Sequence, residues 1–393
     1  MSKKTALVAL AAVFVLAMLT VASAKPNVAD TTKKGSLLVF PKVEVFKGDL
    51  VDDHDGSDGR SGVDTFIFIG NDNVVPVSIK CYWMDNNQTI EDFQFTITPN
   101  QPVFFSAATG GGDGQSLTVP PFSGVGSLVC FAVEDSGAIQ KKFNHLYGNA
   151  MIVSPALGGT QAAMYNAYSF ANPGSVGNPG QLQLDGVSYD ACPQYLVTDF
   201  IAATDNETQS ILPSPPFYRP DLSLWPCIQD LRQDRTPTCT KAKFDVWNAN
   251  EIKFTGAYQC LKCFYEGFLD EIGRKNHVAH FSDGDNTQRG PGFGWDKFVR
   301  NALRTDVARF RVQGVASTVC DNKIRGCPSG PGVTKATPFL GVLLYAEDLV
   351  GATVNNAKIV APLTGSTLFG AGLDNTGSIL WDFDALPPQA PKK

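Results

Sequence analysis

Hydrophobic and polar positions alternate most regularly in residues 63–105. Within Val77–Trp83 every second residue is apolar, and the same period of two recurs in Phe93–Thr98 before Pro99 turns the chain. This period places one face of a strand in a core and the other face towards water. The stretch therefore predicts consecutive strands joined by tight turns, the pattern of an antiparallel β-sandwich.

The same pattern predicts strands elsewhere in the chain. The first, Ser36–Val45, contains Pro41, and we expect it at a sheet edge because proline cannot donate to a β-ladder. The other expected strands are Val63–Ile69, Val74–Trp83, Phe93–Thr98, Val103–Ser106, Gly126–Glu134, Asn149–Ser154, Ala163–Phe170, Ala308–Val312, Leu340–Ala346 and Ser378–Trp381. Phe264–Ile272 is expected as a short helix.

The strand pattern divides the chain into two modules. Residues 25–172 predict a first β-sandwich module, and residues 241–385 predict a second. Residues 173–240 are rich in Pro and Gly and predict a connector that packs onto a domain. Residues 386–393 are expected to form a disordered tail.

Two alignments of the halves each predict a duplicated module. The first sets Ile67–Asn73 against Phe244–Asn250, and Gly124–Cys130 against Gly314–Cys320. The second sets Val129–Asp135 against Val342–Asp348 and leaves Leu343 where the first half has Cys130. The sequence alone does not decide between them.

Four segments resemble a group of uncharacterised exported bacterial proteins with tandem Ig-like β-sandwich modules. They are Asn144–Val153, Tyr165–Phe170, Tyr189–Val197 and Trp247–Cys260. The resemblance covers most of the mature chain. It implies export and an all-β fold of two tandem Ig-like antiparallel β-sandwich modules with a Pro/Gly-rich connector, and it implies no activity.

Residues 1–24 have the composition of a cleavable secretory signal. Lys3 and Lys4 precede the apolar run Ala6–Leu19, and small residues ending in Ala24 follow. An uncleaved anchor is the alternative, which the small residues disfavour. We expect a product without a membrane span after cleavage, in the periplasm or outside the cell.

The charge balance is acidic. The chain has 32 Lys and Arg against 38 Asp and Glu, a net charge of −6. Loss of the two lysines in residues 1–24 leaves 30 against 38, or −8. An acidic chain without a visible Lys/Arg cluster is not expected to bind nucleic acid or anionic membrane surfaces.

All nine cysteines follow the expected cleavage site. Cys81 and Cys130 lie on inward faces of expected strands, which predicts an inter-sheet disulfide worth about 2–4 kcal/mol. Cys260 and Cys320 are the equivalent pair in the first alignment. Buried free thiols are the alternative. For the remaining cysteines the sequence leaves the connectivity open; they are Cys192, Cys227, Cys239, Cys263 and Cys327.

Two short motifs suggest metal or redox chemistry, and a structural interpretation is favoured for both. Cys260 and Cys263 form a C-x-x-C, for which two disulfides with different partners are favoured over a redox dithiol, a zinc half-site or a haem attachment. His277 and His280 are three residues apart beside basic residues, where a solvated segment is favoured over a metal site.

An acidic loop, residues 48–62, offers a candidate calcium site. Asp53, Asp55, Ser57 and Asp58 supply closely spaced oxygen atoms, with glycines that let the backbone turn. The loop lacks the twelve-residue spacing and terminal Glu of a typical calcium loop. An ordinary polar loop is the alternative, and no other cofactor is expected.

The chain has no G-x-S-x-G elbow, phosphate loop, dinucleotide fingerprint or H-E-x-x-H motif. We therefore expect an exported, non-catalytic structural or binding protein, similar to a scaffold or adhesin, with a protein or glycan partner at the cell exterior. One alternative is a secreted or periplasmic hydrolase with an acidic site at a sandwich rim. Another is a subunit that self-assembles through the strand Ser36–Val45.

Overall fold

The computed structural model describes most of the chain as β-structure. The described residues are 27–46, 62–85, 89–112, 119–156, 159–174, 178–202, 217–233, 235, 239–269, 272, 298, 300–316, 336–348, 353–354, 357–358 and 364–382. Their only α-helix is α2 (Arg300–Leu303), so the all-β prediction is confirmed. No helix in this part of the chain has the length and apolar character needed to cross a bilayer.

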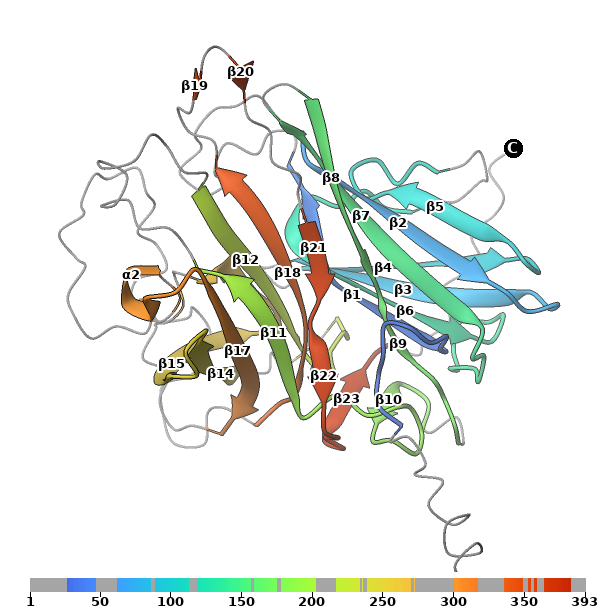
Figure 1. Cartoon of the computed structure of the whole chain (residues 1–393). Coiled ribbons are helices and arrows are strands. Elements are labelled where there is room, and N and C mark those ends of the chain that lie inside the picture. Colours follow the sequence, from blue (N-terminus) through green and yellow to red (C-terminus); the bar gives the residue numbers. More distant parts are fainter. Residues whose placement is uncertain are drawn as a thin grey trace, which may run out of the picture.

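The first half of the chain forms two antiparallel sheets (Figure 1). The strand orders are β4-β3-β6-β1-β9 and β5-β2-β7-β8. The strands are β1 (Leu37–Val45), β2 (Asp64–Asn71), β3 (Val77–Asp85), β4 (Ile90–Ile97), β5 (Pro102–Ser106), β6 (Gly124–Val133), β7 (Leu146–Ala156), β8 (Gly159–Asn166) and β9 (Tyr168–Phe170). We call them the first five-stranded sheet and the first four-stranded sheet.

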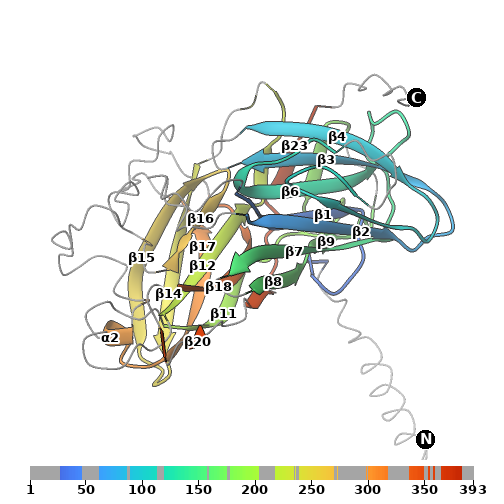
Figure 2. The same ribbon diagram turned by 90° about the horizontal axis from the view of Figure 1, so that it is seen from above.

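The second half also forms a five-stranded and a four-stranded sheet. The orders are β15-β14-β17-β11-β22 and β16-β12-β18-β21. The strands are β11 (Tyr195–Ile201), β12 (Phe217–Pro226), β14 (Cys239–Asn248), β15 (Lys253–Lys262), β16 (Tyr265–Phe268), β17 (Val307–Val315), β18 (Phe339–Asp348), β21 (Thr364–Thr367) and β22 (Phe369–Ala371). The two halves lie side by side in both views (Figure 2).

The strand order is the same in the two halves. Taken in chain order, β1 to β9 correspond one by one to β11, β12, β14, β15, β16, β17, β18, β21 and β22. The first sequence alignment follows this order only in part, since Gly124–Cys130 lies on β6 and Gly314 lies on β17, and the second does not follow it. Ile67–Asn73 lies on β2 whereas Phe244–Asn250 begins on β14, and Val129–Asp135 begins on β6 whereas Val342–Asp348 lies on β18.

A small third sheet connects the halves. It has the order β10-β23-β13, with β10 (Gln181–Leu184), β13 (Ile228–Asp230) and β23 (Gly377–Leu380). Its side chains join a buried cluster with the first five-stranded sheet, in which Trp381 contacts Phe131 with ring centroids 5.0 Å apart. A two-stranded ribbon, β19 (Thr353–Val354) and β20 (Ala357–Lys358), completes the strands.

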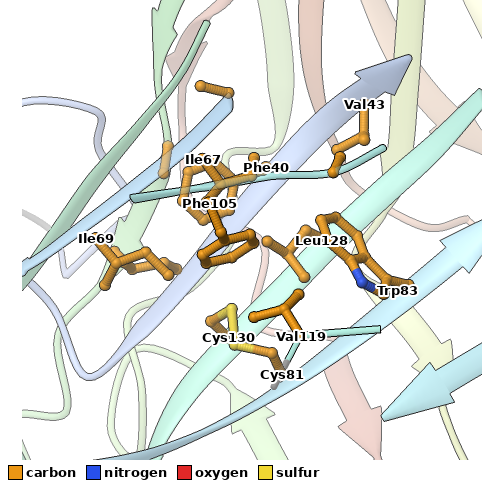
Figure 3. Packing of buried hydrophobic residues seen from close by; sticks show 14 of the residues in the cluster. Phe40, Val43, Ile67, Ile69, Cys81, Trp83, Phe105, Val119, Leu128 and Cys130 are labelled. Atoms are coloured by element: carbon orange, nitrogen blue, oxygen red, sulfur yellow. A yellow bond between two sulfur atoms is a disulfide. The ribbon is translucent and has the colours of Figure 1, made fainter. Parts of the chain in front are cut away.

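Alternation along β3 explains the first core. Ile79, Cys81 and Trp83 point inwards and are almost completely buried. Trp83 packs against Phe105 and other rings that come from both sheets (Figure 3). Burial of apolar surface of this size is the main favourable term in folding, at roughly 25 cal/mol per Å².

Residues 173–240, which we expected to be a connector, contribute four strands. They are β10, β11, β12 and β13, and β11 and β12 belong to the two sheets of the second half. The expected helix Phe264–Ile272 is wrong over Tyr265–Phe268, which form β16 and pair with β12. A long-range β-ladder overrides a weak local helix signal.

The expectation that β1 is an edge strand is also wrong. β1 lies between β6 and β9, and all of its residues are buried. Its register with β6 shifts between Phe40 and Val43. Pro41 lies in this irregularity, where a missing backbone donor is tolerated. β9 pairs with Leu37–Val39 of this strand, and self-assembly through it stays a prediction.

Candidate functional site

The pairing of Cys81 with Cys130 is confirmed. A disulfide joins the two residues, whose Cα atoms are 4.1 Å apart (Figure 3). They lie directly opposite each other on neighbouring strands, β3 and β6, of one sheet. The disulfide therefore cross-links two neighbouring strands of the first five-stranded sheet. The expectation of an inter-sheet disulfide is wrong.

A second disulfide joins Cys192 and Cys227, with Cα atoms 6.6 Å apart, inside the buried cluster of the small sheet. Cys260 is also disulfide-bonded, whereas Cys263 is a buried thiol. The expectation that both cysteines of the C-x-x-C form disulfides is therefore wrong for Cys263. Cys320 lies outside the described residues, so its pairing with Cys260 stays a prediction.

The candidate calcium ligands Asp53, Asp55, Ser57 and Asp58 lie outside the described residues, as do His277 and His280. The calcium site therefore stays a prediction. Two other groups of polar side chains stand out in the described part of the chain. One is buried between the halves, and the other covers the exposed face of a sheet.

A buried lysine and three carboxylates meet where the halves join. Lys42 on β1 is completely buried, and its Nζ lies 2.8 Å from Asp221 Oδ2 on β12 and 2.8 Å from Glu266 Oε1 on β16. It also pairs with Glu44, two residues along β1, and lies 3.4 Å from Ser223 Oγ. We call Lys42, Glu44, Asp221 and Glu266 the junction cluster.

The junction cluster has more carboxylates than cations. Burial raises the pKa of Glu266 well above its usual value, and the nearby carboxylates of Asp221 and Glu44 raise it further, whereas Lys42 opposes this. Glu266 therefore takes up a proton more readily than an exposed glutamate does.

The three carboxylates of the junction cluster also have oxygen atoms within 4.8 Å of one another, a spacing that could suit a metal ion. The Lys42 ammonium already lies among these oxygens. Three N–H donors suit three carboxylate acceptors, so the lysine supplies the positive charge that a metal ion would supply elsewhere. We interpret the cluster as an ionic contact that fixes the two halves relative to each other.

A tyrosine makes a second polar contact between the halves. Tyr168 Oη lies 2.8 Å from the carbonyl oxygen of Leu368 and 3.0 Å from that of Gly341. This buried hydroxyl belongs to β9 and its acceptors belong to the second half. Together with the junction cluster it specifies one arrangement of the halves, because a buried polar group without its partner is costly.

The outer faces of the two five-stranded sheets differ in the cations and aromatic rings that reach solvent. In the first sheet, Leu37, Tyr82, Val129 and Phe131 face outwards and are buried under the small sheet and neighbouring segments. In the second sheet, most residues at outward positions are charged, aromatic or amide-bearing, and most are partly exposed. Much of this face is therefore an apolar packing surface in the first half, although Asp92 and Gln94 on β4 are partly exposed, whereas the equivalent face of the second half is mostly polar.

The exposed surface lies on β15, β14, β17, β11 and β22. The first half contacts β12, β16, β18 and β21, so this surface lies on the far side of the second half (Figure 2). We call it the cation–aromatic face. Its main side chains are Tyr195, Val197, Asp199, Lys241, Lys243, Asp245, Trp247, Lys253, Tyr258, Arg309, Arg311, Gln313 and Phe369.

Arg311 lies at the centre of the face. Its guanidinium is 5.3 Å from the ring centre of Tyr195 and 5.8 Å from that of Trp247. It donates to Asp245 Oδ2 at 2.6 Å. Lys253 lies over Trp247 at 5.2 Å, and 3.4 Å from the second Asp245 oxygen. Cation–π and ionic contacts thus hold the central side chains in fixed positions.

Further cations extend the face. Lys241 lies over the ring of Tyr258 at 4.9 Å. Arg309 donates two hydrogen bonds to Asp199, at 2.6 and 3.0 Å. At one end the face is limited by Cys260, which shares this side of β15 but is completely buried.

The electrostatics of the face are positive. Five cations face two carboxylates, an excess of three charges. Burial raises the pKa of Asp245, but the hydrogen bond from Arg311 and the charges of Lys243, Lys253 and Arg311 together bring it below its usual value. The hydrogen bond from Arg309 likewise lowers the pKa of Asp199. Both acids stay ionised and orient the arginines beside them.

Inspection of the sequence missed both groups. Lys42, Asp221 and Glu266 are separated by many residues and have no common motif. The cations of the face come from three strands, so they form no run along the chain. The one local signal is alternation, since Lys241, Lys243, Asp245 and Trp247 occupy every second position of β14.

A further exposed apolar surface lies on the first four-stranded sheet. Its outer face includes Phe104, Tyr147 and Met164, which are exposed. Phe104 stacks on Phe68 with ring centroids 5.8 Å apart. None of these four residues is a lysine or an arginine, so this exposed surface differs in charge from the cation–aromatic face.

Comparison with known proteins identifies no family. No family model matches the sequence, and no curated protein is significantly similar to it. The structure "Thermotoga maritima 1070" is 10% identical, and the match covers 35% of this chain and 95% of that chain with a TM-score of 0.24. A "putative secreted protein" from Parabacteroides distasonis ATCC 8503 is 7% identical over 80% of this chain and 92% of that chain, with a TM-score of 0.16. Neither TM-score is high enough to support an argument about fold or function.

Proposed function

We propose that the chain is an exported, non-catalytic binding protein built from two duplicated β-sandwich modules, with the cation–aromatic face as its binding surface. The repeated strand order supports duplication. Disulfides, which persist in oxidising compartments, and the sequence of residues 1–24 support export.

One observation carries the proposal. The outward positions of the two five-stranded sheets are equivalent, but only those of the second sheet have cations and aromatic rings that reach solvent. Tyr, Trp and Arg are the residues most enriched at binding hot spots, and polar side chains on a rigid sheet are well ordered for binding. A scaffold with no binding role has no need of such a surface.

The test is adhesion of the labelled, mature protein to the surface fraction of cells that export it. Phe369→Ala with Tyr258→Ala removes two exposed rings of the face, and Tyr147→Ala with Met164→Ala removes matched side chains from the other exposed sheet. We expect the first variant to bind about tenfold more weakly, a loss usual for aromatic anchors. We expect the second to bind as the wild type does. Equal binding by both variants would overturn the proposal.

A further inference from the structure

We propose that the cation–aromatic face binds an acidic polysaccharide, a chain of sugar units that bear carboxylate or sulfate groups. This inference rests on the proposed function and adds the chemical class of the partner. It is argued from the charge of the face, its flat geometry and the position of its aromatic rings.

Charge complementarity is the first argument. The whole chain has a net charge of −6, yet this face has five cations and two carboxylates. Arg309 and Arg311 are each paired with an aspartate. Lys253 also lies 3.4 Å from Asp245, so five cations share two carboxylates on this face. Lysine and arginine bind carboxylate and sulfate groups through charge-assisted hydrogen bonds.

The flat sheet is the second argument. Outward side chains on one strand are roughly 7 Å apart, and neighbouring strands are roughly 5 Å apart. On β17, Arg311 lies opposite Asp245 and Arg309 lies opposite Trp247. Lys241, Lys243, Arg311 and Arg309 therefore follow one another in a row along two neighbouring strands and do not surround a pocket. A small anion would contact one or two of these cations. An extended polymer with a charge on each unit would contact several at once.

The aromatic rings are the third argument. Tyr258 is 36% exposed and lies under Lys241, and Trp247 lies under Lys253. At the opposite edge Phe369 is 76% exposed. Aromatic rings combine an apolar face with a polar or electropositive edge, so they pack against the C–H bonds of a sugar ring while adjacent lysines reach its acidic groups. A purely ionic partner would make no use of these rings.

The experiment is titration calorimetry of the full mature chain with polygalacturonate, chondroitin sulfate, dextran and single-stranded DNA of matched length. We expect binding to at least one of the two acidic polysaccharides, weaker at high salt because exposed charges are screened. We expect no binding to neutral dextran. Dextran binding as tight as polygalacturonate binding would overturn the proposal. DNA binding as tight as the best polysaccharide would overturn it too, because charge alone would then explain the affinity.

Three variants locate the site. Lys241→Gln with Lys243→Gln removes two cations from the face, and Lys141→Gln with Lys142→Gln makes the same change in charge in the first half. We expect the first pair to lower the affinity about tenfold and the second to leave it unchanged. Asp199→Asn raises the excess of positive charge and is expected to tighten binding. Equal affinities of the two lysine variants would overturn the proposal.

The two proposals fail in different ways. If the Phe369 and Tyr258 variant loses adhesion to the cell surface but neither acidic polysaccharide binds, the face is a binding site for another class of partner. The proposed function then stands and the ligand class is wrong. If that variant adheres as the wild type does, the proposed function fails whatever the calorimetry shows.

Discussion

Lys42 of the first half and Asp221 of the second half form a fully buried ion pair, with Nζ and Oδ2 2.8 Å apart. Neither group could be buried without the other, because an isolated charge in the protein interior is costly. The contact therefore ties the position of β1 to that of β12. A slide of one half over the other would separate the charges, so the pair favours a single arrangement of the halves.

Replacement of the lysine is expected to be strongly destabilising. Lys42→Met keeps the apolar stem but leaves three carboxylates close together without their cation. We expect a loss of about 3–5 kcal/mol in the free energy of unfolding, the usual cost of breaking a buried pair. Lys34→Met removes a surface pair with Asp72 and is expected to cost less than about 1 kcal/mol. Equal losses in urea unfolding of the two variants would contradict this interpretation.

The stability should fall as the pH rises above the acidic range. The pKa of Glu266 is raised in the folded protein above the ordinary value of 4.5, so the folded state binds this proton more tightly than the unfolded state. The stabilisation is complete below the unfolded pKa and is lost as the pH rises through the folded pKa.

Glu266→Gln imitates the neutral side chain and should flatten this decline. The measurement is the free energy of unfolding in urea between pH 5 and pH 8. This window begins about where an unfolded Glu has lost its proton. We expect the variant to be more stable than the wild type at the upper end. A variant with an unchanged pH slope would show that Glu266 is not the group responsible.

Peptide mapping without reduction should recover the Cys81–Cys130 and Cys192–Cys227 bridges. The first sequence alignment also predicts a Cys260–Cys320 peptide, although the strand order places Cys260 on β15, the counterpart of β4, and Cys81 on β3. A different partner for Cys260 would contradict that alignment. Cys263 should be alkylated only after unfolding, because its thiol is buried.

We expect Trp381 to contribute strongly to the stability of the folded protein. Its ring packs edge-on against Phe131 and lies under the Lys80 ammonium at 5.2 Å. We expect Trp381→Ala to cost about 3–5 kcal/mol of stability, as for other buried large-to-small changes. Phe369→Ala, which truncates an exposed ring, is the matched control and should change the melting temperature little. A small shift for both would contradict the role given to Trp381.

The alternation of apolar and polar residues predicted the positions of strands and their inward faces, which depend on neighbouring residues in the sequence. The alternation around Cys81 and Trp83 indicated β3 and its inward face, and it led to the correct partner for Cys81. It could not indicate which sheet holds that partner, because strand order depends on contacts far apart in the sequence. The same limit explains Pro41, which suggested an edge strand but lies in an irregular ladder at the centre of a sheet.

Other elements have misleading local signals. Pro220 and Pro226 of β12 favour a connector, because proline is rare inside strands. β12 nevertheless pairs with β16 and β18. The segment Phe264–Ile272 predicts a short helix, whereas Glu266 is in β16 and faces Lys42. The junction cluster requires a lysine from one half and acids from the other, which no spacing rule can identify.

The position of β23 has a consequence for the order in which the protein becomes native during synthesis. Its ladder partners β10 and β13 precede it by more than a hundred residues, and the next residue, Trp381, covers the outer face of the first five-stranded sheet. Until the ribosome has made this last strand, Phe131 and its apolar neighbours have no cover from it. The first half therefore cannot bury this part of its outer face before β23 is made, and non-local closure of this kind is typically slow and leaves apolar surface exposed in the meantime.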